Sequence, residues 1–253
     1  MASLRTPVEP ISYKELFKAC ELFKKDYYAY NGPWLEAYES VDWNSLCDLS
    51  IEDVRVKVIG FLNKWKCRLP YSDSLAKGIK EAHRDSIPFL SALEEETIED
   101  WEEGKVKEVG GHSFTNSEML LRVFSRFVAI GERFSHVATS KVLHFLKPKL
   151  VVMWDNRIAS QYDIRMTASN YVFQFIPLMK RKANEVIRSY LIEKGCGREE
   201  AVLALNRFSP PKTIANLLDE YNYMRFTRGE STQEDRGFSL TLSHFCFLFG
   251  VVC

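Results

Sequence analysis

Helix start signals that directly precede apolar residues at helical spacing constrain this chain more than any other feature. Ser50 with Asp53 makes a capping-box pattern, and Thr115 with Glu118 makes a second one. The apolar residues that follow recur at the 3.6-residue period of a helix with one buried face. They are Val54, Val58, Phe61, Leu62 and Trp65 after the first signal, and Leu120, Phe124, Phe127 and Val128 after the second. The sequence therefore predicts a helix in each region.

The longest helical segment is predicted over 168–193, where apolar residues again recur at helical spacing. Pro177 should kink or divide it, because proline donates no backbone N–H. Gly195 is the expected stop, since glycine readily adopts the left-handed conformation that ends helices. Residues 209–211, Ser-Pro-Pro, are expected to open a further helix through Leu217 and Leu218.

Strand signals are weak in comparison. No segment alternates polar and apolar residues for long enough to predict a sheet, and the strand-like exception is 150–154. The apolar tail 238–253 is either strand-like or poorly specified, and its structure is left open. We therefore predict a mostly α protein. Residues 1–237 would form a two-lobed helical domain, and the turn-rich acidic connection at 94–116 is either the lobe boundary or a surface loop.

Composition limits the classes of function. The chain has 253 residues, 46% of them hydrophobic, and a formal net charge of zero, which argues against a surface that is basic all over. The charge is uneven, however: ten basic residues stand against three acidic ones in 133–188, and the acidic excess lies in 94–108. Each run is a solvated face by default, and the basic one becomes a groove for phosphates if its members converge in space.

Several other classes lack their motifs. The six cysteines show no CxxC pair and no cluster with histidine, so no metal site is expected, and a reducing compartment fits best. No GxGxxG, GxxxxGK[ST], HExxH or GxSxG motif occurs, and no cofactor is expected. The N-terminus has no signal-peptide core and the 16-residue tail is short for a membrane span. We expect an intracellular protein, in the cytoplasm or nucleus, without a membrane partner.

Residues 140–159, SKVLHFLKPKLVVMWDNRIA, are the best candidate for chemistry. They predict a helix ended by Pro148, a buried apolar run, and Asp155 at the start of the next helix. A tight connection before this stretch would put residues 138–141, Ala-Thr-Ser-Lys, in the first turn of the helix. Free backbone N–H groups and the helix dipole favour an anion there, and phosphate is one candidate.

A helix-hairpin-helix element followed by an apolar segment and an aspartate resembles the helix-hairpin-helix DNA glycosylase superfamily, over roughly residues 115–175. That family is all-α, with two lobes and a DNA-binding cleft between them. Its lyase-competent members carry a lysine on the second hairpin helix, which the resemblance puts at or near Lys141, and an aspartate that matches Asp155. The hairpin turn here lacks the family's glycines, and alignment on Val137 puts Ser140 in the lysine column instead. The stretches 61–69, 212–227 and MWDNRIA also resemble uncharacterised microbial proteins.

The resemblance implies a base-excision DNA glycosylase or abasic-site lyase. The Lys141 amine would attack the sugar C1′ and form a Schiff base, while Asp155 orients the amine and stabilises positive charge on the sugar. The partner would be duplex DNA with a damaged base or an abasic site, and Trp154 and Trp34 would line the pocket for a flipped base. The residues expected to contact DNA are Arg133, His136, Ala138, Thr139, Ser140, Lys147, Lys149 and Arg157.

Each of these residues also has a structural interpretation. Asp155 is a good helix N-cap without any chemistry, and Trp154 can simply fill the core. The aromatic residues around Trp34 can pack about the Gly32-Pro33 turn. The rival hypothesis is therefore a non-catalytic helical protein that keeps the fold and binds DNA or another protein. A common cleft that holds both Lys141 and Asp155 would favour the catalytic pair.

Overall fold

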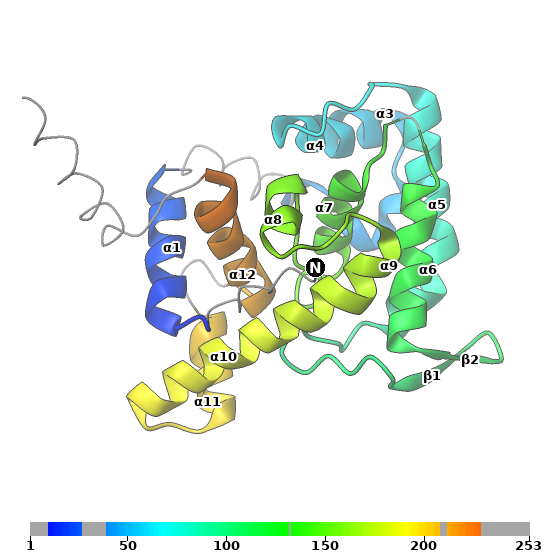
Figure 1. The fold of residues 1–253 in the computed structure, drawn as a ribbon. Helices are drawn as coiled ribbons and strands as arrows, with labels where there is room; N and C mark the ends of the chain where they lie inside the picture. The colour runs from blue at the N-terminus through cyan, green and yellow to red at the C-terminus, as the bar shows by residue number, and fades with distance from the viewer. Residues whose placement is uncertain (1–9, 27–38, 132, 208–211, 229–253) are drawn as a thin grey trace, which may run out of the picture.

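The structure is a computed structural model that describes residues 10–26, 39–131, 133–207 and 212–228. Trp34, residues 209–211 and the apolar tail 238–253 lie outside the described residues. The described part is mostly helical with one β-hairpin (Figure 1), which confirms the predicted fold class at that level. No helix in it is both long enough and apolar enough to cross a membrane.

The elements follow one another along the chain in this order. The first half contains α1 (Tyr13–Asp26), η1 (Trp43–Asp48), α3 (Ile51–Asp53), η2 (Val54–Ile59), α4 (Gly60–Lys64) and α5 (Asp73–Ala92). The hairpin consists of β1 (Val106–Val109) and β2 (His112–Thr115). The second half contains α6 (Asn116–Val128), α7 (His136–Leu146), α8 (Asn156–Gln161), α9 (Ala168–Asn170), η3 (Tyr171–Phe175), α10 (Ile176–Lys194), α11 (Arg198–Asn206), α12 (Ile214–Asn222) and η4 (Tyr223–Arg228).

The predicted helix starts are confirmed. The Thr115 hydroxyl accepts from the N–H of Glu118 at 3.2 Å, and the Glu118 carboxylate accepts from the N–H of Thr115 at 2.7 Å, which completes a capping box. Ser50 accepts from the N–H of Asp53 at 3.0 Å and begins the helical run of α3, η2 and α4. These caps satisfy donors that a helix start otherwise leaves unbonded.

The long segment after residue 168 is helical throughout its predicted length. Pro177 lies in the first turn of α10, directly after the π-helical η3, where its missing N–H costs little. The proline therefore marks a change of helix type. Gly195 ends the run with φ 64°, and its N–H donates to the carbonyl of Leu191 at 2.9 Å. The predicted stop is confirmed.

The strand expected at 150–154 is not formed, and the tail 238–253 lies outside the described residues. The described part has its strands at 106–109 and 112–115, in an antiparallel pair that turns at Gly110 and Gly111, both at positive φ. Each strand has four residues, too few for a clear alternation of polar and apolar side chains. Residues 150–154 are buried as expected but pair with no strand in the described part. The helix expected from 209–211 instead begins at Ile214, with Thr213 as its cap.

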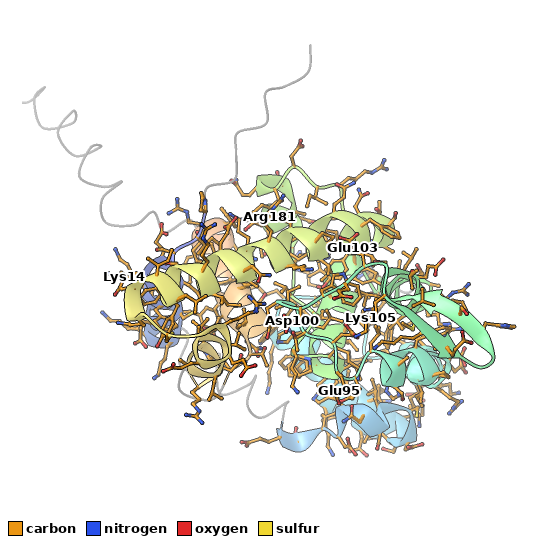
Figure 2. All side chains as sticks on the ribbon, turned by 90° about the horizontal axis from the view of Figure 1, so that it is seen from below. Lys14, Glu95, Asp100, Glu103, Lys105 and Arg181 are labelled. Carbon is orange, nitrogen blue, oxygen red and sulfur yellow. The ribbon has the colours of Figure 1, made fainter. Side chains whose placement is uncertain are left out.

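The acidic connection at 94–116 is partly neutralised by ion pairs. Glu96 is buried and accepts from Lys105 at 2.9 Å and from Lys107 at 2.6 Å. Asp100 pairs with Arg198 at 2.9 Å. Figure 2 shows this connection beside α10. Helices α5 and α6, which lie on either side of the connection in sequence, pack against each other, and a lobe boundary there remains a prediction.

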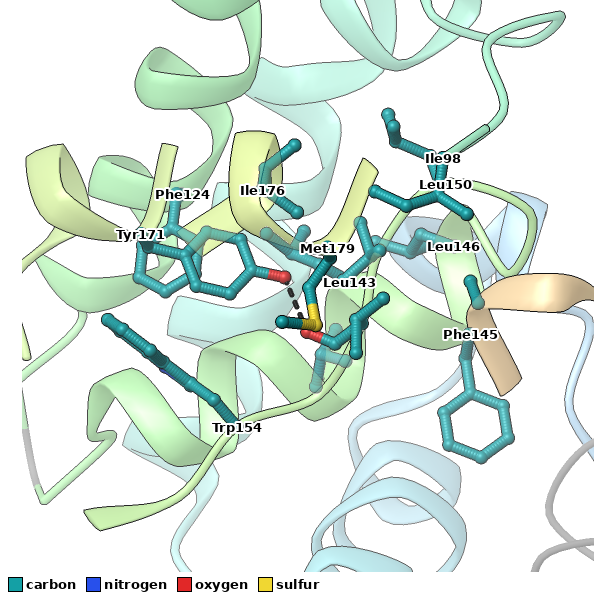
Figure 3. Packing of buried hydrophobic residues seen from close by; sticks show 14 of the residues in the cluster. Ile98, Phe124, Leu143, Phe145, Leu146, Leu150, Trp154, Tyr171, Ile176 and Met179 are labelled. Atoms are coloured by element: carbon teal, nitrogen blue, oxygen red, sulfur yellow. Dashed lines mark hydrogen bonds between the residues drawn. The ribbon is translucent and has the colours of Figure 1, made fainter. Parts of the chain in front are cut away.

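The core surrounds α7 and the segment 150–154 that follows it (Figure 3). Tyr171 is fully buried, and its hydroxyl donates to the carbonyl of Val152 at 2.7 Å. The Trp154 ring contacts Tyr171 at 4.9 Å and Phe175 at 5.2 Å between centroids. This packing fixes the direction in which the chain leaves the core just before Asp155.

His144 ties three parts of this core together. Its Nδ1 lies 2.6 Å from the carbonyl oxygen of Val151, and its Nε2 lies 2.6 Å from the side-chain amide of Asn216 on α12. A carbonyl can only accept, so the proton is on Nδ1, and Nε2 accepts from Asn216. Burial lowers the pKa of His144 to about 4, so the ring is neutral near pH 7. The neutral ring joins α7, the segment 150–154 and α12.

Candidate functional site

A pocket of about 560 Å³ is lined mainly by residues from four parts of the chain. Most of them come from the end of α4 and the segment after it, from the start of α7 and its Lys141, from the start of α8, and from α12 with η4, and Phe23 of α1 completes the lining. Figure 1 shows α8 between α12 and α7. Lys141 and Asp155 both line this pocket. The two residues predicted as a catalytic pair therefore share one cleft, although they are separated by the turn at Pro148 and a buried segment.

Lys141 is held against the segment 64–68. Its Nζ donates to the carbonyl of Trp65 at 2.7 Å, lies 3.6 Å from Sγ of Cys67, and lies 5.5 Å from the centroid of the Trp65 ring. The side chain is half-buried. Within the described ranges, no ion pair shorter than 4 Å joins Lys141 to a carboxylate. The amine reaches the pocket but is bonded to its wall.

Asp155 is the N-cap of α8, as the sequence predicted. One carboxylate oxygen accepts from the N–H groups of Arg157 and Ile158, both at 2.8 Å. The other oxygen accepts from the hydroxyl of Thr227 at 2.7 Å. These three hydrogen bonds fix the orientation of the carboxylate, and a carboxylate has about four lone-pair sites, so acceptor capacity remains toward the pocket.

Asp219 on α12 is a third ionisable group in the pocket, which sequence reasoning missed. Burial is the main cause that raises its pKa well above the usual value, and the nearby carboxylates of Glu220 and Asp155 act in the same direction. Lys141 opposes the shift. A carboxyl group in this setting holds a proton more readily than a free aspartate. The one available signal was an acidic residue directly after the apolar pair Leu217-Leu218.

Cations surround the mouth of the pocket. Lys64, Lys66 and Arg68 come from one segment and Arg157 from α8, and all four are exposed. Together with Lys141, the lining has five cationic side chains and two carboxyl groups. The segment 64–68 was not among the predicted contacts, although three cations in five residues were visible in the sequence.

The predicted anion site in the first turn of α7 is not formed. The helix begins at His136, two residues earlier than expected, with Ser135 as its cap. The N–H groups of Ala138 and Thr139 already donate to the Ser135 hydroxyl and carbonyl at 3.3 and 2.9 Å. The side chains of Ala138, Thr139 and Ser140 are fully buried. The N–H groups of Ala138 and Thr139 are therefore occupied, and the Thr139 hydroxyl, which has no partner, is buried out of reach of a phosphate.

Ser140 and Lys141 are the two residues that alignment could place at the position of the glycosylase lysine, and their side chains point in different directions. The Ser140 hydroxyl donates to the carbonyl of Val137 at 3.0 Å and accepts weakly from the N–H of Trp154 at 3.4 Å, inside the core. Lys141 lines the pocket. Successive residues on a helix differ by about 100° in direction, which places one side chain in the core and the next in the cleft.

The other predicted DNA contacts are spread over separate regions. Arg157 lines the pocket. Arg133 is exposed in the turn before α7, and His136, the first residue of α7, is half-buried. Lys147 and Lys149 lie past the opposite end of α7, a helix of 11 residues that is about 16 Å long. Both line a second cavity of about 380 Å³. Lys147 is buried there and paired with Glu94, so it is not a surface cation.

The basic run at 133–188 does not converge on one groove. Of its ten cations, Lys141 and Arg157 line the pocket. On α10, Lys180 donates to the carbonyl of Trp101 at 2.5 Å, and Lys182 is buried and paired with Glu185. Arg181 is exposed on the same helix (Figure 2). The number of basic residues in 133–188 therefore overstated the positive charge on the surface around α7.

Trp154 is 1% exposed, and its ring fills the core, although the residue also borders the pocket. No hydrogen-bond partner is present for its Nε1. Trp34, the other predicted base-pocket residue, lies outside the described residues. Within the part that the structure covers, no cluster of three or more His, Cys, Asp or Glu side chains is placed to hold a metal ion.

Comparisons with protein-family models, with curated proteins and with solved structures found no significant match to this chain.

Proposed function

We propose that this protein binds DNA and acts as a base-excision glycosylase or abasic-site lyase with a two-lobed fold of helix-hairpin-helix glycosylase type. The observation that supports the proposal best is the shared pocket of Lys141 and Asp155. An amine and an oriented carboxylate in one pocket are the groups that Schiff-base chemistry on a sugar requires.

The proposed reaction begins when Lys141 leaves the Trp65 carbonyl and loses a proton. Its amine attacks C1′ of the sugar, the base or, at an abasic site, water leaves, and a Schiff base forms between Nζ and C1′. Asp155 stabilises the positive charge that develops on the sugar. Asp219 is the candidate acceptor or donor of the transferred proton, because it lines the same pocket and its pKa is raised.

The size of the pocket suits one nucleotide. At about 560 Å³ it falls within the range of small-molecule sites, and a duplex does not fit. The target nucleotide would therefore have to leave the base stack, which costs least at an abasic site or a damaged base. The exposed cations at the mouth suit the backbone that remains outside.

Borohydride trapping tests the lyase. A duplex with one abasic site is incubated with the protein and reduced, which converts a Schiff base into a stable adduct on a denaturing gel. We expect an adduct with the native protein, loss of at least tenfold in Lys141→Ala, and an unchanged yield in Lys77→Ala, which alters an exposed lysine on α5. An adduct that persists in Lys141→Ala would exclude Lys141 as the nucleophile.

The alternative function is non-catalytic binding of DNA or a protein. The observation that favours it is that both oxygens of Asp155 already serve as caps and tethers, and that the Lys141 amine is bonded to Trp65. Under this alternative no adduct forms, and the abasic duplex binds only if the partner is DNA. Duplexes with uracil, 8-oxoguanine and 3-methyladenine extend the same assay to the glycosylase reaction.

A further inference from the structure

We propose that the segment 64–68, together with Arg157, is a preformed phosphate clamp at the mouth of the pocket. The clamp would hold a backbone phosphate next to the nucleotide that enters the pocket. DNA as the source of that phosphate rests on the proposed function, whereas the preference for a phosphate group rests on the geometry of the segment itself.

The backbone of the segment is strained at two of its residues. Lys66 has φ 63° and Arg68 has φ 54°, the left-handed region that residues other than glycine seldom adopt. Each such residue costs on the order of 1–3 kcal/mol and persists where its surroundings hold it. The chain thus accepts strain at two of its three cations in this segment.

Three groups hold the segment in this shape. The Asn63 side chain donates to the carbonyl of Leu69 at 2.9 Å and accepts from the N–H of Leu69 at 2.6 Å, which closes the segment at its base. The N–H of Lys66 donates to the Asn63 carbonyl at 2.9 Å. Lys141 anchors the middle through the Trp65 carbonyl. A segment fixed in this way loses little conformational entropy when it binds.

Lys66, Arg68 and Arg157 are the cations of the clamp that are available to a ligand. In the part of the chain that the structure covers, no ion pair shorter than 4 Å engages Lys66 or Arg68, and both are exposed. Arg157 uses one guanidinium nitrogen on the Thr227 carbonyl, which fixes its position and leaves its other donors. A phosphate suits this set, because guanidinium groups bind its oxygens in pairs and an ammonium adds a point charge.

The clamp also lies next to the proposed nucleophile. Trp65, whose carbonyl accepts from Lys141, is flanked in sequence by Lys64 and Lys66. A phosphate bound by the segment therefore lies close to the amine, and the nucleotide attached to it is directed into the pocket. The clamp is a binding element, and its loss should weaken affinity more than it alters a reaction within the bound complex.

Fluorescence anisotropy with a labelled duplex that carries a tetrahydrofuran abasic analogue tests the clamp, because this analogue binds but forms no Schiff base. The variants are Lys66→Gln, Arg68→Gln and the double variant, with Lys77→Gln as the matched control. We expect the double variant to bind at least tenfold more weakly at 100 mM salt. Its slope of log K against log salt should be smaller by about 1, since one neutralised phosphate contributes about 0.9. Lys77→Gln should change neither quantity.

Unchanged affinity and salt slope in a folded double variant would overturn the clamp, and so would the absence of measurable binding by the native protein. Competition by inorganic phosphate separates the two sources of the bound phosphate group, the DNA backbone and free phosphate. If inorganic phosphate displaces the duplex no better than chloride does at the same ionic strength, the result supports the DNA backbone. Tight binding of free phosphate without duplex binding overturns it. A reduced salt slope combined with a negative borohydride assay keeps the clamp and rejects the lyase, so the two proposals can fail separately.

Discussion

Acid should destabilise this protein through His144, whose buried neutral ring joins α7, the segment 150–154 and α12. Burial lowers the pKa of His144 from 6.5 to about 4 in the folded state. Between these values the unfolded chain binds a proton at this site that the folded protein does not. The stabilisation is therefore complete above about pH 6.5 and is lost as the pH falls toward 4.

The size of the effect follows from the two pKa values. A shift of this extent corresponds to about 3 kcal/mol over the whole range, and to about 2 kcal/mol between pH 7 and pH 5. His83 is also buried, and burial lowers its pKa to about 4, so the native protein should lose a similar further amount. Replacement of His144 isolates one of the two contributions.

Urea unfolding at pH 7, 6 and 5 measures the effect. His144→Gln should be less stable at pH 7, because the Val151 carbonyl and the Asn216 amide lose a well-placed partner. Its loss of free energy of unfolding between pH 7 and pH 5 should nevertheless be smaller than the native loss by about 2 kcal/mol. His112→Gln, on the exposed strand β2, should keep the native pH dependence. The reasoning is refuted if His144→Gln and the native protein lose the same free energy over this range.

Three further substitutions test individual contacts by urea unfolding at pH 7. Asp155→Ala removes the cap of α8 and should lower the free energy of unfolding by about 1–2 kcal/mol; an unchanged midpoint would contradict the cap. Tyr171→Phe leaves the buried Val152 carbonyl without its donor and should cost about 1–3 kcal/mol, whereas a neutral effect would mean that another donor replaces it. Gly78→Ala should destabilise by about 1–3 kcal/mol despite the better helix propensity of alanine, because its Cβ would lie 2.8 Å from a methyl carbon of Ile130; a more stable variant would show that Ile130 moves freely.

The sequence predicted helix starts and stops correctly where the stabilising hydrogen bonds join residues close together in the chain. The capping box at Thr115, the stop at Gly195 and the cap at Asp155 each depend on hydrogen bonds over two to four residues. The β-hairpin at 106–115 was not predicted, because strands of four residues show almost no alternation of polar and apolar side chains, although Gly110-Gly111 is a typical turn signal.

The candidate site was predictable only in part. The stretch that resembles a helix-hairpin-helix element pointed to Lys141 and Asp155, and both line one pocket. Asp219 and the segment 64–68 were missed, because nothing in the order of residues relates α4 or α12 to α7. The contacts expected at 138–140 stay a prediction, and the burial of these three side chains in the core depends on packing that the sequence does not show.

The sequence by itself determined that the chain is mostly helical, where several helices begin and end, and that a carboxylate caps α8. These properties depend on backbone donors and short side chains within one turn. The tertiary structure alone decided which charges share a surface. Packing of α4, α7, α8 and α12 brings Lys66, Arg68, Lys141, Asp155 and Asp219 to one pocket, and it buries Lys147 and Lys182 away from it. Charge acts through distance in space, and distance in space depends on the packed core.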